Sequence, residues 1–166
     1  MRRSVAFSLG SNLGDRRAAL ERALARLGEE IEDLSASGLY ETAPVEVEEA
    51  QPDYLNACAA GRSELSPRQL LALCKRLEAE AGRAPGGHRR PRTLDVDLLL
   101  VGDLRLKVKE LELPHPGLPR RRFVLEPLAE LLPEWRHPES GDSVREMLEA
   151  LGGEQAVQHH VEEDES

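Results

Sequence analysis

Residues 88–103 read His-Arg-Arg-Pro-Arg-Thr-Leu-Asp-Val-Asp-Leu-Leu-Leu-Val-Gly-Asp, and the interpretation of the whole chain starts from this stretch. Residues 94–101 form a short apolar run that only Asp95 and Asp97 interrupt, with a proline before it and a glycine after it. Such a run predicts a buried strand. Because side chains alternate along a strand, the two aspartates point to one face, with Cα atoms about 6.6 Å apart.

Two carboxylates beside a core need a partner, because an unpaired buried charge is costly. Mg2+ meets that need, since it typically takes one or two carboxylates and also binds substrate phosphates. The basic residues just before the aspartates, within 88–92, suit a polyanion at the same place. The stretch predicts a metal and phosphate site. The alternative is that Asp95 and Asp97 pair with these arginines at a solvated strand end.

Length and charge restrict the class of protein. The chain has 166 residues and a formal net charge of −9, which indicates one domain and disfavours nucleic-acid or anionic-membrane partners. Cys58 and Cys74 lack the spacing of metal ligands. No run approaches the roughly 20 apolar residues of a membrane span. We expect a cytoplasmic monomer with one domain over residues 1–152 and an acidic, disordered tail over 153–166.

Hydrophobic patterns predict the secondary structure. Residues 10–15, Gly-Ser-Asn-Leu-Gly-Asp, are predicted to form a turn that caps a helix ending at Gly28. Ser66 and Gln69 predict a capping box with proline at the first helical position, and this second helix ends at Gly82. Strands are expected at 4–9, 31–40, 54–63 and 94–101, followed by a hairpin within 104–113 and short helices at 127–132 and 144–151. This order is that of a ferredoxin-like βαββαβ antiparallel sheet, an α+β fold, with an appended C-terminal part.

Polar and aromatic residues outside the central stretch suggest a second binding feature. Tyr54 and Asn56 are in phase on a predicted strand, so an aromatic ring and an amide face one side. A flat ring system could stack on Tyr54 or Phe123 while Asn56 reads its edge, although core packing of both aromatics is the alternative. His115 lies between two prolines near three arginines, where it either donates to a phosphate or is a surface residue.

Five separated motifs resemble those of one enzyme family. They are Gly-Ser-Asn-Leu-Gly at 10–14, Tyr-Glu-Thr at 40–42, Gln-Pro-Asp-Tyr-Leu-Asn at 51–56, Pro-Arg-Thr-Leu-Asp-Val-Asp-Leu-Leu at 91–99, and Pro-His-Pro at 114–116 with Arg-Arg-Phe-Val-Leu-Glu-Pro-Leu at 121–128. Their order and spacing resemble 6-hydroxymethyl-7,8-dihydropterin pyrophosphokinases over about residues 4–150. The resemblance implies the ferredoxin-like fold and transfer of pyrophosphate from MgATP to the hydroxymethyl group of the reduced pterin, with release of AMP, in folate biosynthesis.

The resemblance also implies roles for individual residues. Asp95 and Asp97 would bind two Mg2+ ions, and Glu78 would support the site from the second helix. The residues implied to act in catalysis are Arg83, Arg92, Asp95 and Asp97. Those implied to contact ATP, the co-substrate, are Arg83, Arg92, His115 and Arg121. Those implied to contact the pterin are Thr42, Val45, Tyr54, Asn56 and Phe123.

The chain also departs from the family pattern. Arg90 stands where the family commonly has glycine or alanine, Arg89 stands where some members carry an aromatic residue, and Ala43 stands where some carry proline. The segments 43–51 and 83–92 are expected to act as lids that exclude water. Two other functions fit the same residues: a metal-dependent nucleotidyl or phosphoryl transferase without a pterin, and a small-molecule-binding regulatory module.

Overall fold

The structure is a computed structural model that describes residues 2–42, 53–82, 93–152 and 158–160, the last of these by backbone alone. The N-terminal two thirds of the chain form a βαββαβ unit in which the second strand is divided into two shorter strands, β2 and β3. Its elements are β1 (Arg3–Ser11), α1 (Arg16–Glu30), β2 (Glu32–Ala36), β3 (Leu39–Thr42), β4 (Tyr54–Ser63), α2 (Pro67–Glu80) and β5 (Asp95–Val101). The predicted order of elements and the α+β class are confirmed.

The strands form one antiparallel sheet with the order β5-β1-β4-β3, and β2 pairs with β4 beside β3. The single strand predicted over 31–40 is two strands, which pair with different halves of β4. The extended strand is interrupted at Ser37, between β2 and β3. The Ser37 hydroxyl accepts a hydrogen bond from Cys58 N–H at 2.9 Å. Both strands pair with β4 in antiparallel orientation.

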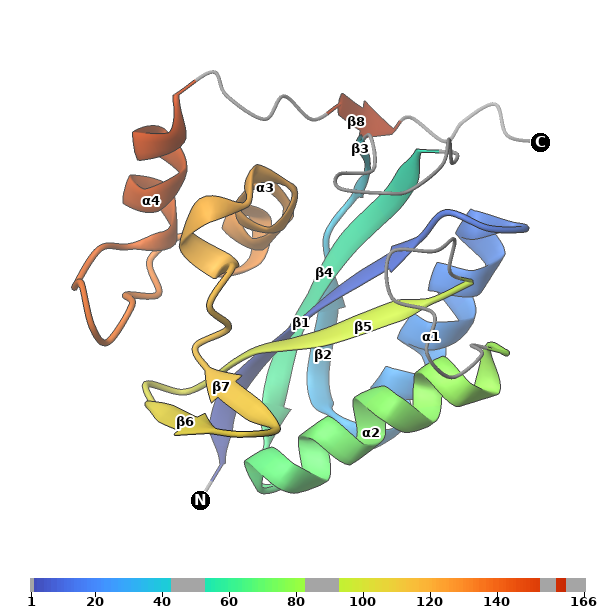
Figure 1. The fold of residues 1–166 in the computed structure, drawn as a ribbon, viewed down its shortest axis with the longest axis horizontal. Coiled ribbons are helices and arrows are strands. Elements are labelled where there is room, and N and C mark those ends of the chain that lie inside the picture. Colours follow the sequence, from blue (N-terminus) through green and yellow to red (C-terminus); the bar gives the residue numbers. More distant parts are fainter. Residues whose placement is uncertain (1, 43–52, 83–92, 153–157, 161–166) are drawn as a thin grey trace.

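Helices cover both faces of the sheet (Figure 1). On one side α1 and α2 pack against Val5, Phe7 and Leu9 of β1 and enclose the larger core. On the other side lie α3 (Arg122–Leu131) and α4 (Val144–Leu151), over a second core that includes Ala6 and Cys58. Because alternate residues of β1 enter different cores, one strand joins the three layers.

Local signals in the sequence predicted the starts of α1 and α2. Asp15 Oδ1 accepts a hydrogen bond from Ala18 N–H at 3.1 Å, and Ser66 forms the predicted capping box with Gln69. The predicted end of the first helix at Gly28 is wrong, since α1 continues to Glu30. The next residue, Ile31, is 3% exposed and packs in the core. Its burial stabilises the last residues of the helix more than the glycine destabilises them.

The C-terminal part closes the second layer. A hairpin of β6 (Leu106–Val108) and β7 (Leu111–Leu113) precedes a short 3-10 helix at Leu118–Arg120. Helix α3 begins at Arg122 rather than at the predicted Pro127, because Val124 and Leu125 already face the core. Within the segment expected to be a disordered tail, Gln158–His160 form β8, which pairs with β3.

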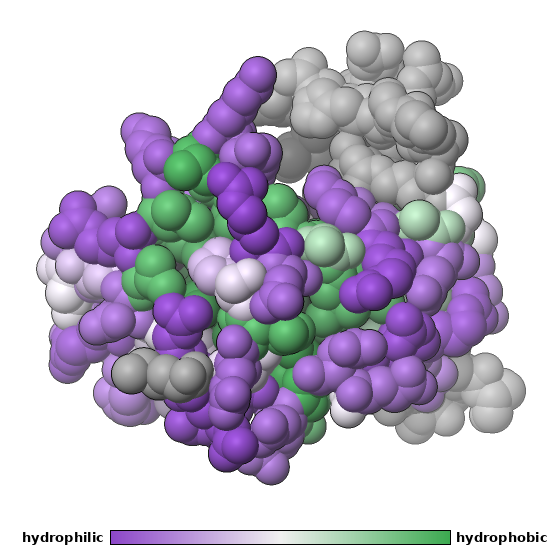
Figure 2. Space-filling view, turned by 90° about the horizontal axis from the view of Figure 1, so that it is seen from below, coloured by the Kyte–Doolittle hydropathy of each residue, from purple (hydrophilic) through white to green (hydrophobic). Residues whose placement is uncertain are grey.

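The surface is mainly polar. Figure 2 shows charged and polar side chains over most of the face seen from below, with apolar groups between them. Among residues with described side chains, the large apolar ones that are exposed are Leu13 and Val108. Within the described ranges, none of the helices has the length and apolar character needed to cross a bilayer.

Candidate active site

The two aspartates lie on one face of β5, as predicted. Burial alternates along the start of this strand, with Val96 and Leu98 buried in the larger core while Asp95 and Asp97 are partly exposed on the opposite face. The side chain of Asp97 is 40% exposed. Alternation therefore directs both carboxylates toward the α3 side of the sheet, where β5 is accessible.

The strand register connects the aspartates to the residues predicted to hold a planar ligand. Asp95 pairs with Gly10 of β1, and Gly10 pairs on its other side with Asn56 of β4. Residues that pair directly across strands share a face. Since neighbouring strands lie about 4.8 Å apart, Asp95 and Asn56 are separated by about 10 Å across the sheet. Gly10 lies between them and leaves the sheet surface without a side chain.

Thr42, Tyr54 and Asn56 form a polar and aromatic group at the other end of this row. Asn56 is 4% exposed, and its Nδ2 donates to Thr42 Oγ1 at 3.0 Å. Thr42 pairs directly with Tyr54 in the β3–β4 ladder. A β-carbon added to Gly10 would lie 2.8 Å from Asn56 Oδ1 and 3.3 Å from Tyr54 Cδ1. The side chains of Asn56 and Tyr54 therefore lie against the backbone of Gly10, which is buried.

Glu78 reaches the aspartate strand from α2. Its side chain is 4% exposed, and its Oε2 accepts a hydrogen bond from Val96 N–H at 2.8 Å. Val96 lies between the two aspartates, so this bond fixes the backbone that carries both carboxylates. A buried carboxylate that accepts a backbone N–H is a strong, charge-assisted contact. Glu78 thus holds the backbone between Asp95 and Asp97 from the α2 side of the sheet, which fits the supporting role that the sequence resemblance implied.

His115 is held beside Asp97 by its backbone and its ring. His115 N–H donates to Leu99 O of β5 at 2.8 Å, and His115 Nδ1 accepts from Gly117 N–H at 3.0 Å. In the neutral ring the proton is therefore on Nε2, which lies 4.0 Å from Asp97 Oδ2. Burial, with a further contribution from Arg121, lowers the pKa of His115 to about 4. At neutral pH this histidine is an uncharged donor that faces the acid pair.

Arg121 brings a fixed positive charge to the same place. A β-carbon added to Gly117 would lie 2.6 Å from Arg121 Nε, so the guanidinium lies directly on the Gly117 backbone. Its Cζ is 5.7 Å from the centroid of the Phe123 ring, a distance that permits a cation–π contact. The charge of Arg121 acts on both neighbours: it opposes part of the rise in the pKa of Asp97, and it adds to the fall that burial causes in the pKa of His115.

Phe123 lies on the face of the sheet that carries Asn56. The thiol of Cys58, two residues beyond Asn56 on β4, donates to Val124 O at 3.6 Å. That contact brings the start of α3 over β4, and Phe123 packs at the edge of the second core. Burial raises the pKa of the Cys58 thiol, so this cysteine stays protonated beneath the site.

The acid pair has the electrostatics of a cation site. Loss of solvation at the partly exposed Asp97 side chain, together with the neighbouring Asp95 carboxylate, raises the pKa of Asp97 to about 7. A bound divalent cation would relieve the repulsion that causes this shift. Among the residues with described side chains, no group of three or more His, Cys, Asp or Glu side chains could hold a metal ion. Two carboxylates fit Mg2+, which fills its remaining positions with water and phosphate oxygens.

The structure brings together most of the side chains predicted from the sequence. Asp95, Asp97, His115 and Arg121 gather around the start of β5, and Thr42, Tyr54, Asn56 and Phe123 lie on the same face. Arg83, Arg92 and Val45 lie outside the described residues, as do Arg89, Arg90 and the whole of the two segments expected to act as lids.

Sequence reasoning missed two residues that the structure places at the site. Gly10 was assigned to a turn, but it lies within β1 between Asp95 and Asn56. Arg16 was assigned no role, and it contacts residues next to Thr42 and Tyr54. A signal for Arg16 was present: a cation in the first turn of a helix is unfavourable beside the helix dipole and needs another partner.

Comparisons with known proteins identify relatives of this chain. Residues 6–133 match the family model for 7,8-dihydro-6-hydroxymethylpterin-pyrophosphokinase (HPPK). The 2-amino-4-hydroxy-6-hydroxymethyldihydropteridine pyrophosphokinase of Porphyromonas gingivalis is 43% identical over 141 residues, which cover 82% of this chain and 95% of that protein. A folic acid synthesis protein of Schizosaccharomyces pombe is 38% identical over 147 residues, 87% of this chain but 20% of that protein.

Solved structures agree on the fold. A crystal structure of an HPPK-DHPS in complex with substrates has a TM-score of 0.72 and 12% sequence identity to this chain. The match covers 90% of this chain and 43% of that one. This chain therefore spans less than half of that protein and a fifth of the Schizosaccharomyces pombe protein, but nearly all of the Porphyromonas gingivalis enzyme.

Proposed function

The chain belongs to the 7,8-dihydro-6-hydroxymethylpterin-pyrophosphokinase family, and on that basis we propose that it transfers pyrophosphate from MgATP to 6-hydroxymethyl-7,8-dihydropterin. The products are AMP and the pterin diphosphate, and the step belongs to folate biosynthesis. The observation that carries this proposal is the row Asp95–Gly10–Asn56 across three adjacent strands. It separates an acid pair from a ring-binding group by about 10 Å, a span that the reacting ends of two bound substrates can bridge.

Asn56 and Thr42 are proposed to recognise the edge of the pterin. The Asn56 amide has a donor and an acceptor, and its hydrogen bond to Thr42 Oγ1 fixes its orientation. Tyr54 and Phe123 supply aromatic faces on which a flat ring can stack. The absence of a side chain at Gly10 leaves room for Asn56 and Tyr54 in these positions. Val45 is proposed to contribute a backbone contact to the same ring.

Asp95 and Asp97 are proposed to hold Mg2+, with two ions as the expected number. When bound, Mg2+ would offset the negative charge of the triphosphate and orient it. His115 Nε2–H and the Arg121 guanidinium are placed to donate to phosphate oxygens near Asp97. Arg83 and Arg92 are proposed to contact ATP from the segment before β5. Positioning and charge stabilisation are the main tasks of a protein in phosphoryl-type transfer.

We also propose that the protein acts as a monomer in the cytoplasm without nucleic-acid or membrane partners. The formal net charge of −9 supports this, because nucleic acids and anionic membranes select for basic surfaces. The scarcity of exposed large apolar side chains in the described part of the chain supports the monomer.

An AMP-release assay with ATP and Mg2+, run with and without the reduced hydroxymethylpterin, tests the proposed reaction. We expect AMP only when the pterin is present. Asp97→Asn should lose most of the turnover, while Asp103→Asn, which removes an exposed carboxylate just after β5, should retain it. ADP as the product would indicate ordinary kinase chemistry, and neither product from a folded sample would indicate a binding module.

A further inference from the structure

Arg16, the first residue of α1, contacts the end of β3 and the residue just before β4. Its Nη1 donates to the backbone carbonyl of Asp53 at 2.9 Å. Its Nη2 forms an ion pair with Glu41 Oε2, also at 2.9 Å. The Arg16 side chain is 26% exposed and that of Glu41 is 31% exposed, so water screens this pair only in part. One guanidinium thus connects the helix to the end of β3 and to the start of β4.

The two contacted residues are the immediate neighbours of proposed pterin contacts. Glu41 precedes Thr42, the last residue of β3, and Asp53 precedes Tyr54, the first residue of β4. Thr42 and Tyr54 are a direct pair at the end of the β3–β4 ladder. Strand ends fray unless something outside the ladder holds them. Arg16 supplies such a contact on both strands at once.

The position of Arg16 in α1 is unfavourable unless these contacts compensate for it. The N-terminus of a helix carries partial positive charge, and Arg16 is adjacent to the N-cap residue Asp15. Lysine could satisfy the charge of Glu41 as a point donor, but the planar fork of arginine can reach the carboxylate and the carbonyl together. The residue type therefore fits the two-point contact.

We propose that Arg16 is a positioning residue of the pterin site. It fixes the pair Thr42–Tyr54 from the side of α1 and thereby the group formed by Thr42, Tyr54 and Asn56. The role in substrate affinity rests on the proposed pterin function, whereas the restraint on the strand ends does not. Arg16 touches neither the acid pair nor His115 in the described contacts, so its removal should separate pterin affinity from nucleotide affinity.

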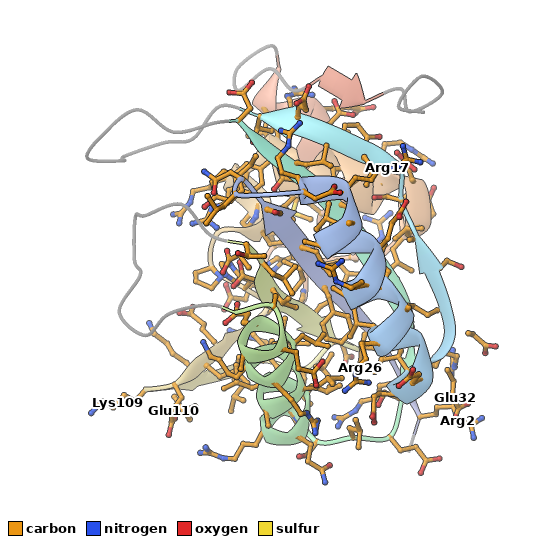
Figure 3. The ribbon with its side chains drawn as sticks, turned by 90° about the vertical axis from the view of Figure 1, so that its right-hand side faces the viewer. Arg2, Arg17, Arg26, Glu32, Lys109 and Glu110 are labelled. Carbon is orange, nitrogen blue, oxygen red and sulfur yellow. The ribbon has the colours of Figure 1, made fainter. Side chains whose placement is uncertain are left out.

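The test compares Arg16→Gln with Arg26→Gln and Arg16→Lys. Arg26 lies farther along the same helix, where Figure 3 shows it near the end of α1 opposite Arg17. It makes a two-point ion pair with Glu80 at 3.0 and 3.1 Å, so its replacement removes a similar contact from the other end of α1. Two quantities are measured: amide hydrogen exchange over residues 39–42 and 54–56 in the ligand-free protein, and the dissociation constants of the pterin and of a non-hydrolysable MgATP analogue.

For Arg16→Gln we expect exchange over 39–42 and 54–56 to accelerate by about threefold or more, with no change over 95–101. The Kd of the pterin should rise by about tenfold while that of the MgATP analogue stays within about twofold, and Arg16→Lys should recover part of the loss. Arg26→Gln should change neither exchange over 39–42 and 54–56 nor pterin affinity. Removal of a cation from a helix N-terminus favours the helix, so weaker helix formation cannot produce this pattern.

Unchanged exchange in Arg16→Gln, or the same acceleration in Arg26→Gln, would overturn the proposed restraint. Equal weakening of both ligands would overturn the specific role in the pterin site. If the unaltered protein bound no pterin, the proposed function would fail, and exchange in the ligand-free variants would still decide whether Arg16 holds the strand ends.

Discussion

At the scale of single residues, the site depends on a carboxylate whose surroundings oppose its charge. Partial loss of solvation and the Asp95 carboxylate raise the pKa of Asp97 to about 7, from 3.8 for the free side chain. The folded chain therefore binds more protons than the unfolded chain between these values. Stability falls as pH rises through this window, since the slope follows the difference in bound protons. The acid pair is a source of instability until a cation binds.

Replacement of Asp97 by asparagine should therefore stabilise the ligand-free protein in a pH-dependent way. At about pH 8 without metal, Asp97→Asn should melt at a higher temperature than the unaltered chain, and the difference should shrink toward about pH 5. Mg2+ with a nucleotide analogue should stabilise the unaltered chain and not the variant. Differential scanning calorimetry at the two pH values measures both effects. A melting difference that is independent of pH would contradict the assigned cause.

Gly10 provides a second prediction at this scale. In Gly10→Ala the new methyl group would meet Asn56 Oδ1 at 2.8 Å, and Asn56 is buried and bonded to Thr42. We expect pterin affinity to fall by about tenfold or more, with nucleotide binding retained. Gly28→Ala is the matched control, because no atom lies within 4 Å of its added β-carbon. That control should be neutral or stabilise the helix by about 0.5–1 kcal/mol. Titrations of both ligands, with thermal melts, measure these effects, and unchanged pterin affinity in Gly10→Ala would contradict the proposed role of Asn56 in pterin binding.

At the scale of elements, several observed helix boundaries differ from those that local sequence signals predict, because tertiary packing determines where these helices begin or end. The capping box predicted at Ser66 lies where α2 begins. Glycine and proline were less reliable guides, since Gly28 lies inside α1 and Pro127 inside α3. In both helices a buried apolar residue near the boundary outweighs the local preference. Elements with a strong cap were predicted closely, and those whose ends depend on tertiary contacts were not.

The C-terminal strand gives a prediction at the element scale. β8 pairs with β3 through Leu39, Tyr40 and Glu41, on the edge opposite β4. Truncation after Gly153 removes that edge pairing but leaves the Thr42–Tyr54 pair intact. We expect turnover to stay within about twofold, and the melting temperature to fall by about 2–4 °C if the pairing contributes about 1 kcal/mol. The AMP assay and a thermal melt measure the two effects. A large loss of turnover would mean that the segment after Gly153 takes part in the site.

At the scale of the whole molecule, one sheet joins two cores. Phe7 and Leu9 enter the core beneath α1 and α2, while Ala6 between Val5 and Phe7 enters the core beneath α3 and α4. The site lies where the second helical layer ends and leaves the start of β5 accessible. A shared sheet predicts that the two layers unfold together.

Two core substitutions test this cooperativity. Leu73→Ala lies in the larger core and Leu125→Ala in the second, and each should reduce the free energy of unfolding by about 2–5 kcal/mol. Urea unfolding followed by Trp135 fluorescence, which reports the second layer, should coincide with unfolding followed by far-ultraviolet circular dichroism. If Leu73→Ala left the Trp135 transition unmoved, the two layers would be independent units.

The sequence by itself determined the kinds of element, the shared face of Asp95 and Asp97, and the phase of Tyr54 with Asn56. These features are local, because period and capping act within a few residues of the chain. It also specified the family, through motifs that span most of the chain.

Only the tertiary structure decided which of these motifs meet. The register that aligns Asp95, Gly10 and Asn56 joins strands distant in sequence, and the bonds of Glu78 to Val96 N–H and of Arg16 to Asp53 and Glu41 cross between layers. Such contacts depend on how whole elements pack, and a single sequence carries no local signal for the partner that lies across the sheet.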